Sequence, residues 1–132
     1  TGASAIVLTA VLLSIEQCKY LTSLAHQLGM EVALKLYTIE EIDYLECDVD
    51  LIIINNRIAC SFDMDVNKSF EFAKLLPADC IKVSEGGIYT PEKAKELSDV
   101  GFQGIIIGDL FMKTANPGYA LGEFIKGIKK EN

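Results

Sequence analysis

Two short aliphatic runs of this 132-residue sequence end abruptly in glycine beside a carboxylate. Residues 80–83 are followed by Ser-Glu-Gly-Gly (84–87), and residues 104–107 are followed by Gly-Asp (108–109). A continuous aliphatic run is typical of a buried parallel strand. In α/β folds, ligands bind and chemistry occurs at the carboxyl ends of such strands. We therefore expect the chain to bring these two strand ends side by side at one site.

Three polar side chains at predicted strand ends are candidates for catalysis or substrate contact. Glu85 can act as a general acid or base, or it can simply pair with Arg57 or a loop amide. Asn55 follows the run at 51–54 and can hydrogen-bond a hydroxyl group or a developing charge, or it can merely close a turn. Arg57 can bind a carboxylate through two parallel hydrogen bonds, or form an ion pair with Glu85.

The glycines at these strand ends suggest a phosphate site. Gly86, Gly87 and Gly108 can present main-chain N–H groups to an anion, although each alone more often marks a tight turn. They follow the last two predicted strands, and barrels favour phosphate sites after their last two strands. Asp109 weakens this interpretation, because a carboxylate repels a phosphate dianion.

Strand and helix patterns alternate along the whole chain. Strands are predicted at 5–9, 31–36, 51–54, 80–83 and 104–107. Helices are predicted from Ser14 to Gly29, from Thr38 to about Glu46, from Asp63 or Asp65 to Pro77, from Thr90 to Gly101, and at 119–129. Strict alternation implies a parallel sheet with right-handed crossovers. We predict one α/β domain over 1–132 with five βα units: a partial (β/α)8 TIM barrel or a flavodoxin-like open sheet.

Composition excludes several classes of function. A net charge of −7 argues against a nucleic-acid partner, and the apolar runs are too short and too interrupted to cross a bilayer. The four cysteines lack CxxC spacing, and with no signal peptide this favours free thiols in a reducing cytoplasm. A metal site is not expected, because His26 is the only histidine and its mid-helix position suits the surface. The chain begins with Thr1 rather than Met, so we expect either a piece cut from a longer protein or a chain whose start is missing from the numbering.

Three motifs resemble the indole-3-glycerol phosphate synthase family. They are Ile-Asn-Asn-Arg (54–57), Val-Ser-Glu-Gly-Gly-Ile (83–88) and Gly-Asp-Leu-Phe-Met (108–112), in the family's order and spacing. The opening at 2–8 and the segment 25–32 resemble the family's fourth strand and the approach to its fifth. The resemblance covers essentially the whole chain. It implies a (β/α)8 barrel of which this chain corresponds to strands four to eight.

The resemblance also implies an activity and a set of roles. The family is a lyase of tryptophan biosynthesis that closes the indole ring of a carboxyphenylamino-deoxyribulose phosphate, losing carbon dioxide and water without any cofactor. Asn55 and Arg57 would contact substrate, and Glu85 would be the carboxylate of the seventh strand. Gly87, Gly108 and Asp109 would line the phosphate pocket. Gly86 would stand where the family has a substrate-binding serine.

Departures from the family pattern lower the activity expected of this chain. Lys35 stands where the fifth strand of the family carries a catalytic glutamate, so a base has become a cation. The family's first three strands, with its catalytic lysine, have no counterpart here. Each missing acid or base typically costs about 10²–10⁴-fold in rate.

Two functions from different classes therefore remain open. One is a synthase homologue that is weak or inactive as this chain alone. The other is a non-catalytic half-barrel that binds a phosphorylated ligand or a partner chain. Because open sheet edges invite pairing, we expect self-association or pairing with a missing N-terminal half. Phosphoribosylanthranilate isomerase is disfavoured by the Asn-Asn-Arg motif.

Overall fold

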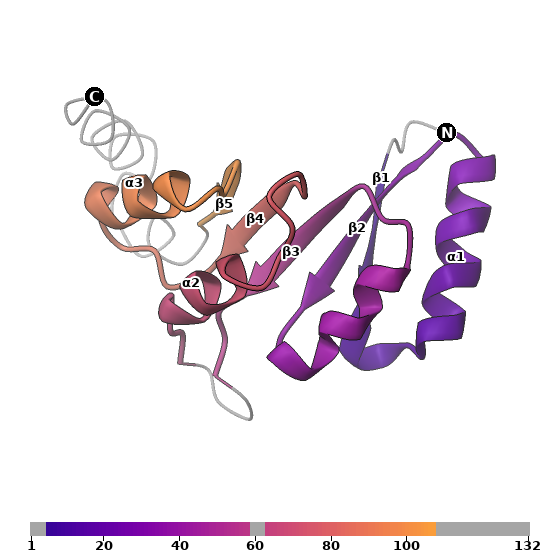
Figure 1. The fold of residues 1–132 in the computed structure, drawn as a ribbon, viewed down its shortest axis with the longest axis horizontal. Helices are drawn as coiled ribbons and strands as arrows, with labels where there is room; N and C mark the ends of the chain where they lie inside the picture. The colour runs from indigo at the N-terminus through magenta and orange to yellow at the C-terminus, as the bar shows by residue number, and fades with distance from the viewer. Residues whose placement is uncertain (1–4, 59–62, 108–132) are drawn as a thin grey trace, which may run out of the picture.

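Five parallel strands form one sheet in the order in which they occur along the chain. The computed structural model describes residues 5–58 and 63–107. The strands are β1 (Ala5–Thr9), β2 (Glu31–Leu36), β3 (Leu51–Asn55), β4 (Lys82–Glu85) and β5 (Gly104–Ile106). The helices are η1 (Ala10–Leu12), α1 (Ile15–Gln27), η2 (Ile39–Glu46), α2 (Asn67–Ala73) and α3 (Pro91–Asp99), where η marks 3-10 geometry (Figure 1).

The strand order decides between the two predicted architectures. A flavodoxin-like sheet has the order 2-1-3-4-5, and the reversal in that order places helices on both faces of the sheet. Here every strand pairs with its sequence neighbour, β1-β2-β3-β4-β5. Sequential order with one βα unit after another is the arrangement of a barrel wall. The described part of the chain is therefore an open, partial α/β barrel, and the flavodoxin-like alternative is wrong.

The core lies between the helices and one face of the sheet. Alternate residues of β2 and β3, such as Leu34 and Ile54, are fully buried there and pack in one cluster with Cys18, Phe72 and Leu97 of the three α-helices. Side chains of the other residues in these strands point to the opposite face. That second face would be the interior of a closed barrel, and it carries Lys35, Asn55 and Glu85.

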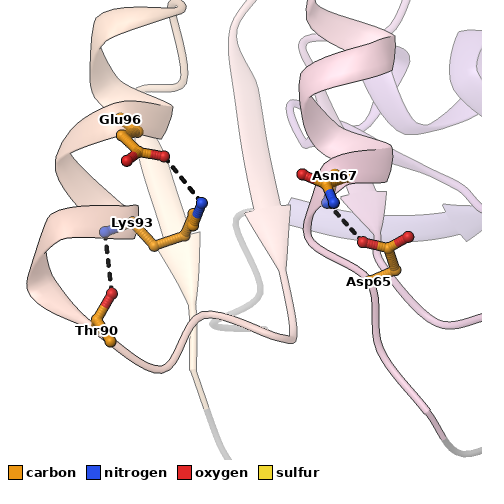
Figure 2. Close-up of polar contacts among 5 residues, drawn as sticks. All are labelled: Asp65, Asn67, Thr90, Lys93 and Glu96. Atoms are coloured by element: carbon orange, nitrogen blue, oxygen red, sulfur yellow. Dashed lines mark hydrogen bonds and ion pairs between the residues drawn. The ribbon is translucent and has the colours of Figure 1, made fainter.

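Side chains cap the helices where the sequence predicted helix starts. The Ser14 hydroxyl accepts a hydrogen bond from the main-chain N–H of Gln17, whose own side chain accepts from Ser14 N–H. Figure 2 shows the same kind of cap in α3, where Thr90 Oγ1 accepts from Lys93 N–H. Each such cap satisfies a main-chain N–H that the helix leaves unpaired. Figure 2 also shows Asp65 Oδ1 accepting from Asn67 N–H, but the N-cap residue of α2 is Val66, which makes no side-chain cap, so the helix start predicted at Asp63 or Asp65 is wrong.

Several predicted boundaries and inward positions are wrong. β3 continues through Asn55, and β4 lies at 82–85 rather than 80–83, so Glu85 belongs to a strand. The helical spacing of Ala94, Leu97 and Val100 predicts that all three face inward, but Val100 is 41% exposed, because α3 ends at Asp99. The spacing of Val66, Phe70 and Ala73 likewise predicts the buried side of the next helix back, α2, but its fully buried residues are Ser69 and Phe72, and Phe70 is only partly buried. The helix predicted at 119–129 lies outside the described residues.

Asp50 ties α1 to the start of β2. Its Oδ2 accepts hydrogen bonds from Val32 N–H at 2.7 Å and pairs with His26 Nε2 at 2.9 Å. The hydrogen bond from His26, followed by that from Val32, lowers the pKa of Asp50 below its ordinary value of 3.8. The carboxylate stabilises the fold above its ordinary pKa, and this contribution disappears as the pH falls through the lowered value.

We therefore expect Asp50→Asn to cost up to about 1 kcal/mol at pH 7, a figure kept small because the carboxylate is 39% exposed. The difference between the two proteins should shrink as the pH falls below about 4. Urea unfolding of both proteins at pH 7 and pH 3 measures it. A difference that stays constant with pH would exclude this linkage.

Candidate functional site

Three of the residues singled out by the sequence, Lys35, Asn55 and Glu85, come together on the face of the sheet that the described helices leave uncovered. Asn55 and Glu85 are register partners on the adjacent strands β3 and β4, so their side chains share this face. Lys35 on β2 is the register partner of Ile53, which precedes Asn55 by two residues on β3, so Lys35 shares the same face. The three side chains thus come from three neighbouring strands at the carboxyl end of the sheet.

Glu85 receives two polar contacts at the same carboxylate oxygen. Lys35 Nζ reaches across β3 to lie 3.0 Å from Glu85 Oε1, and Asn55 Nδ2 donates to that atom at 3.0 Å. The side chains of Lys35 and Glu85 are 21% and 24% exposed, so this ion pair is largely shielded from water. The two contacts hold the carboxylate in one orientation.

The ion pair differs from what the sequence suggested for these residues. The sequence suggested Arg57 or a loop amide as the partner of Glu85 if Glu85 has only a structural role. In the structure the ion pair of Glu85 is with Lys35. The main-chain N–H of Arg57 instead donates to Asn55 Oδ1 at 2.9 Å, which fixes the Asn55 amide so that its nitrogen faces Glu85. Lys35 therefore neutralises the central carboxylate of the site.

A cavity of about 490 Å³ opens at the carboxyl ends of the first three strands. It is lined by Thr9, Val11, Leu12, Tyr37, Thr38, Arg57 and Lys68. Sequence reasoning did not single out Lys68, whose Nζ donates to the main-chain carbonyl of Arg57. Burial lowers the pKa of Lys68, against the opposing charges of Asp65, Glu41 and Glu71. An apolar wall with two cationic side chains suits an organic anion.

The paired glycines after β4 adopt the left-handed conformation that glycine tolerates. Gly86 has φ +94° and Gly87 has φ +72°. Met64 packs against both: a Cβ atom on Gly86 would lie 2.9 Å from Met64 Sδ, and one on Gly87 would lie 3.1 Å from Met64 Cβ. The chain bends at Gly86, and the positive φ angles of both residues agree with the glycine-dependent change of direction that the sequence suggested. The predicted phosphate contacts of Gly87 remain a prediction, and Gly108 and Asp109 lie outside the described residues.

The described cysteines are structural rather than reactive. Cys18, Cys47 and Cys80 are free thiols, and Cys60 lies outside the described residues. Burial, with a contribution from the neighbouring Cys18 thiol, raises the pKa of Cys47 to about 12, and burial also raises the pKa of Cys80. Such thiols are poor nucleophiles at neutral pH. Within residues 5–58 and 63–107, no cluster of three metal-ligating side chains occurs and no helix is long and apolar enough to cross a membrane.

Known proteins with a similar fold are barrel proteins. The chain superposes on 3-hexulose-6-phosphate synthase from Salmonella typhimurium with a TM-score of 0.78 at 13% identity, covering 99% of this chain and 64% of that one. It superposes on an N-acetylmannosamine-6-phosphate 2-epimerase from Clostridium perfringens with a TM-score of 0.63 at 20% identity, covering 97% and 57%. At these identities the likeness establishes the fold alone.

Sequence relatives are more specific. The chain is 45% identical to indole-3-glycerol phosphate synthase of Bacteroides thetaiotaomicron over 97% of its own length and 49% of that protein. It is 34% identical to the same enzyme of Caldanaerobacter subterraneus, again over 97% and 49%. It thus spans about half the length of the curated relatives it matches. The family model described as indole-3-glycerol phosphate synthase matches residues 1–124, and the chain belongs to that family.

Proposed function

We propose that this chain is a single partial-barrel domain that supplies strands four to eight of an indole-3-glycerol phosphate synthase. The reaction is closure of the indole ring of a carboxyphenylamino-deoxyribulose phosphate, with loss of carbon dioxide and water. The observation that carries the proposal is the placement of Asn55 and Glu85 as register partners on the uncovered face of a sheet whose sequence matches this family.

The proposed roles follow from where these side chains lie. Glu85 is the carboxylate that handles a proton or faces positive charge in the transition state, and Asn55 orients it. Arg57 binds the anionic part of the substrate beside the cavity that it lines with Lys68. We assign substrate contact to Gly86, and we assign the phosphate pocket to Gly87, Gly108 and Asp109. No cofactor enters this scheme, and we place the protein in the cytoplasm.

Lys35 limits what the chain does by itself. Its ammonium group neutralises Glu85 and cannot accept a proton while it is charged. This chain alone is therefore expected to show little or no turnover. Substantial turnover requires the barrel strands that complete the site.

Reconstitution tests this assignment. The chain alone, and the chain mixed with the part of the Bacteroides thetaiotaomicron relative that it does not match, are assayed for indole-glycerol phosphate by its fluorescence. We expect a signal at least about 10²-fold higher from the mixture, because the missing acid and base groups are worth that much. Glu85→Gln in the mixture is the matched control and should abolish the gain. A mixture no better than its separate parts would contradict the synthase assignment.

A second candidate is a non-catalytic half-barrel that binds a phosphorylated ligand or a partner chain. The Lys35–Glu85 ion pair favours it, because the pair already neutralises the central carboxylate. Exposed apolar side chains on the outer strands of the described sheet also favour a partner: Val7 on β1 is 55% exposed and Ile106 on β5 is 40% exposed. Light scattering that shows a dimer, together with an inactive mixture, would support this candidate; a monomer at high concentration would count against it.

A further inference from the structure

Asn56 is completely buried between the sheet and α2, and both ends of its amide are hydrogen-bonded. Its Nδ2 donates to Ser84 Oγ at 2.9 Å and to the main-chain carbonyl of Gly86 at 2.8 Å. Its Oδ1 accepts from Ser69 Oγ at 2.7 Å, and the hydroxyls of Ser69 and Ser84 lie 2.6 Å apart. Asn56, Ser69 and Ser84 are all fully buried.

The main chain of Asn56 also links β3 to the end of β4 and to the segment before α2. Its N–H donates to the carbonyl of Glu85 at 2.9 Å, and its own carbonyl accepts from Asp65 N–H at 2.7 Å. Asn56 therefore holds Glu85 itself and the residue on either side of it. The carbonyl that it holds after Glu85 belongs to Gly86, whose φ of +94° makes it the point where the chain leaves the strand.

The two adjacent asparagines act on Glu85 from opposite faces of the sheet. Asn55 points to the uncovered face and donates to the carboxylate, whereas Asn56 points to the helices and holds the main chain. A buried amide costs free energy that an apolar side chain of similar volume does not. Packing alone therefore does not require asparagine at this position, but three precisely placed hydrogen bonds do.

We propose that Asn56 is a positioning residue for Glu85. Through Ser69, Ser84 and the Gly86 carbonyl, it fixes the carboxyl end of β4 so that the Glu85 carboxylate stays within reach of Asn55 and Lys35. Its effect on catalysis rests on the proposed synthase function, whereas its effect on geometry does not. A displacement of about 1 Å at a reacting group can cost about 10²-fold in rate.

The test compares Asn56→Leu, which keeps the branched shape and the number of side-chain heavy atoms but removes the hydrogen bonds, with Phe72→Leu, which removes packing from the same helix as Ser69. Urea unfolding measures the free energy of unfolding of both variants, so that their stabilities can be compared. Two readouts follow: the NMR resonances of the Asn55 side-chain amide in the free chain, and kcat and KM of the reconstituted barrel. We expect Asn56→Leu to move the Asn55 amide towards the position found in Glu85→Ala. We also expect it to lower kcat by about 10²-fold with little change in KM.

Each outcome decides the proposal. Phe72→Leu should leave the Asn55 amide and kcat near wild type even when it is equally unstable. If Asn56→Leu leaves the Asn55 amide in place, the proposal is wrong. If the reconstituted wild-type barrel is inactive, the synthase assignment fails and the amide alone decides the positioning role. If Asn56→Leu does not fold, Ser69→Ala, which removes one hydroxyl, replaces it. The Asn55 amide resonances should then shift in the same direction, and an unchanged amide would again show that the proposal is wrong.

Discussion

Lys35→Glu is expected to make the chain less stable and the reconstituted barrel faster. Lys35 Nζ lies 3.0 Å from Glu85 Oε1 in a pair that is only about a quarter exposed. The substitution removes this attraction and sets two carboxylates against each other. We expect a loss of about 1–3 kcal/mol in the free energy of unfolding, below the cost of breaking a fully buried pair.

Turnover should change in the opposite direction. If the proposed assignment of Lys35 to the position of a catalytic glutamate is right, the substitution restores a carboxyl group there, and a general base is typically worth about 10²–10⁴-fold. Urea unfolding measures the first effect, and the fluorescence assay of the reconstituted barrel measures the second. The control is Lys35→Met, which also removes the ion pair but supplies no base, and should give no gain in turnover. A barrel that is already fast with Lys35 in place would overturn the argument.

Gly86→Ser should destabilise the chain, although it introduces the residue that the proposed assignment expects at this position. Gly86 has φ +94°, which costs a residue with a Cβ about 1–3 kcal/mol. The new Cβ would also lie 2.9 Å from Met64 Sδ. Because Met64 is flexible and its thioether can move aside, most of the cost should come from the main chain. We expect a loss of about 2 kcal/mol in the free energy of unfolding.

The double variant Met64→Ala, Gly86→Ser separates the two causes. Measured against Met64→Ala alone, it should show more than half of the loss seen for Gly86→Ser alone. Recovery of nearly all the stability in urea unfolding would instead show that the contact with Met64 dominates. In the first case the backbone conformation of Gly86 is what disfavours a side chain here, and a serine at this position requires a change in that conformation.

Local patterns predicted most of the scaffold. The capping box at Ser14 and Gln17, the Thr90–Pro91 helix start and the aliphatic run at 51–54 each depend on neighbouring residues, and each gave the correct element. The sequence left the barrel and the open sheet undecided, because strand spacing is the same in both. Strand order decides between them, and it depends on contacts between distant segments.

The sequence predicted which residues belong to the candidate site, but it did not predict which of them contact one another. Asn55, Glu85 and Lys35 were singled out, and the structure brings all three together. That Lys35 reaches across β3 to Glu85 depends on strand register and barrel curvature, for which the sequence has no local signal. Asn56 and Ser69 were missed because buried polar residues resemble turn and helix residues in sequence. The pair of adjacent asparagines after an apolar strand was the one available signal.

Pairing of each strand with only its nearest neighbours in sequence has a consequence for how the protein forms. Every strand pair in the described sheet joins strands that follow one another in sequence, and within residues 5–58 and 63–107 no strand pairs with one further along the chain. This keeps the loop that each pairing must close shorter than in a sheet whose distant strands pair. The first βαβ unit can assemble while later residues are still being synthesised, and each new strand then adds to an edge already in place.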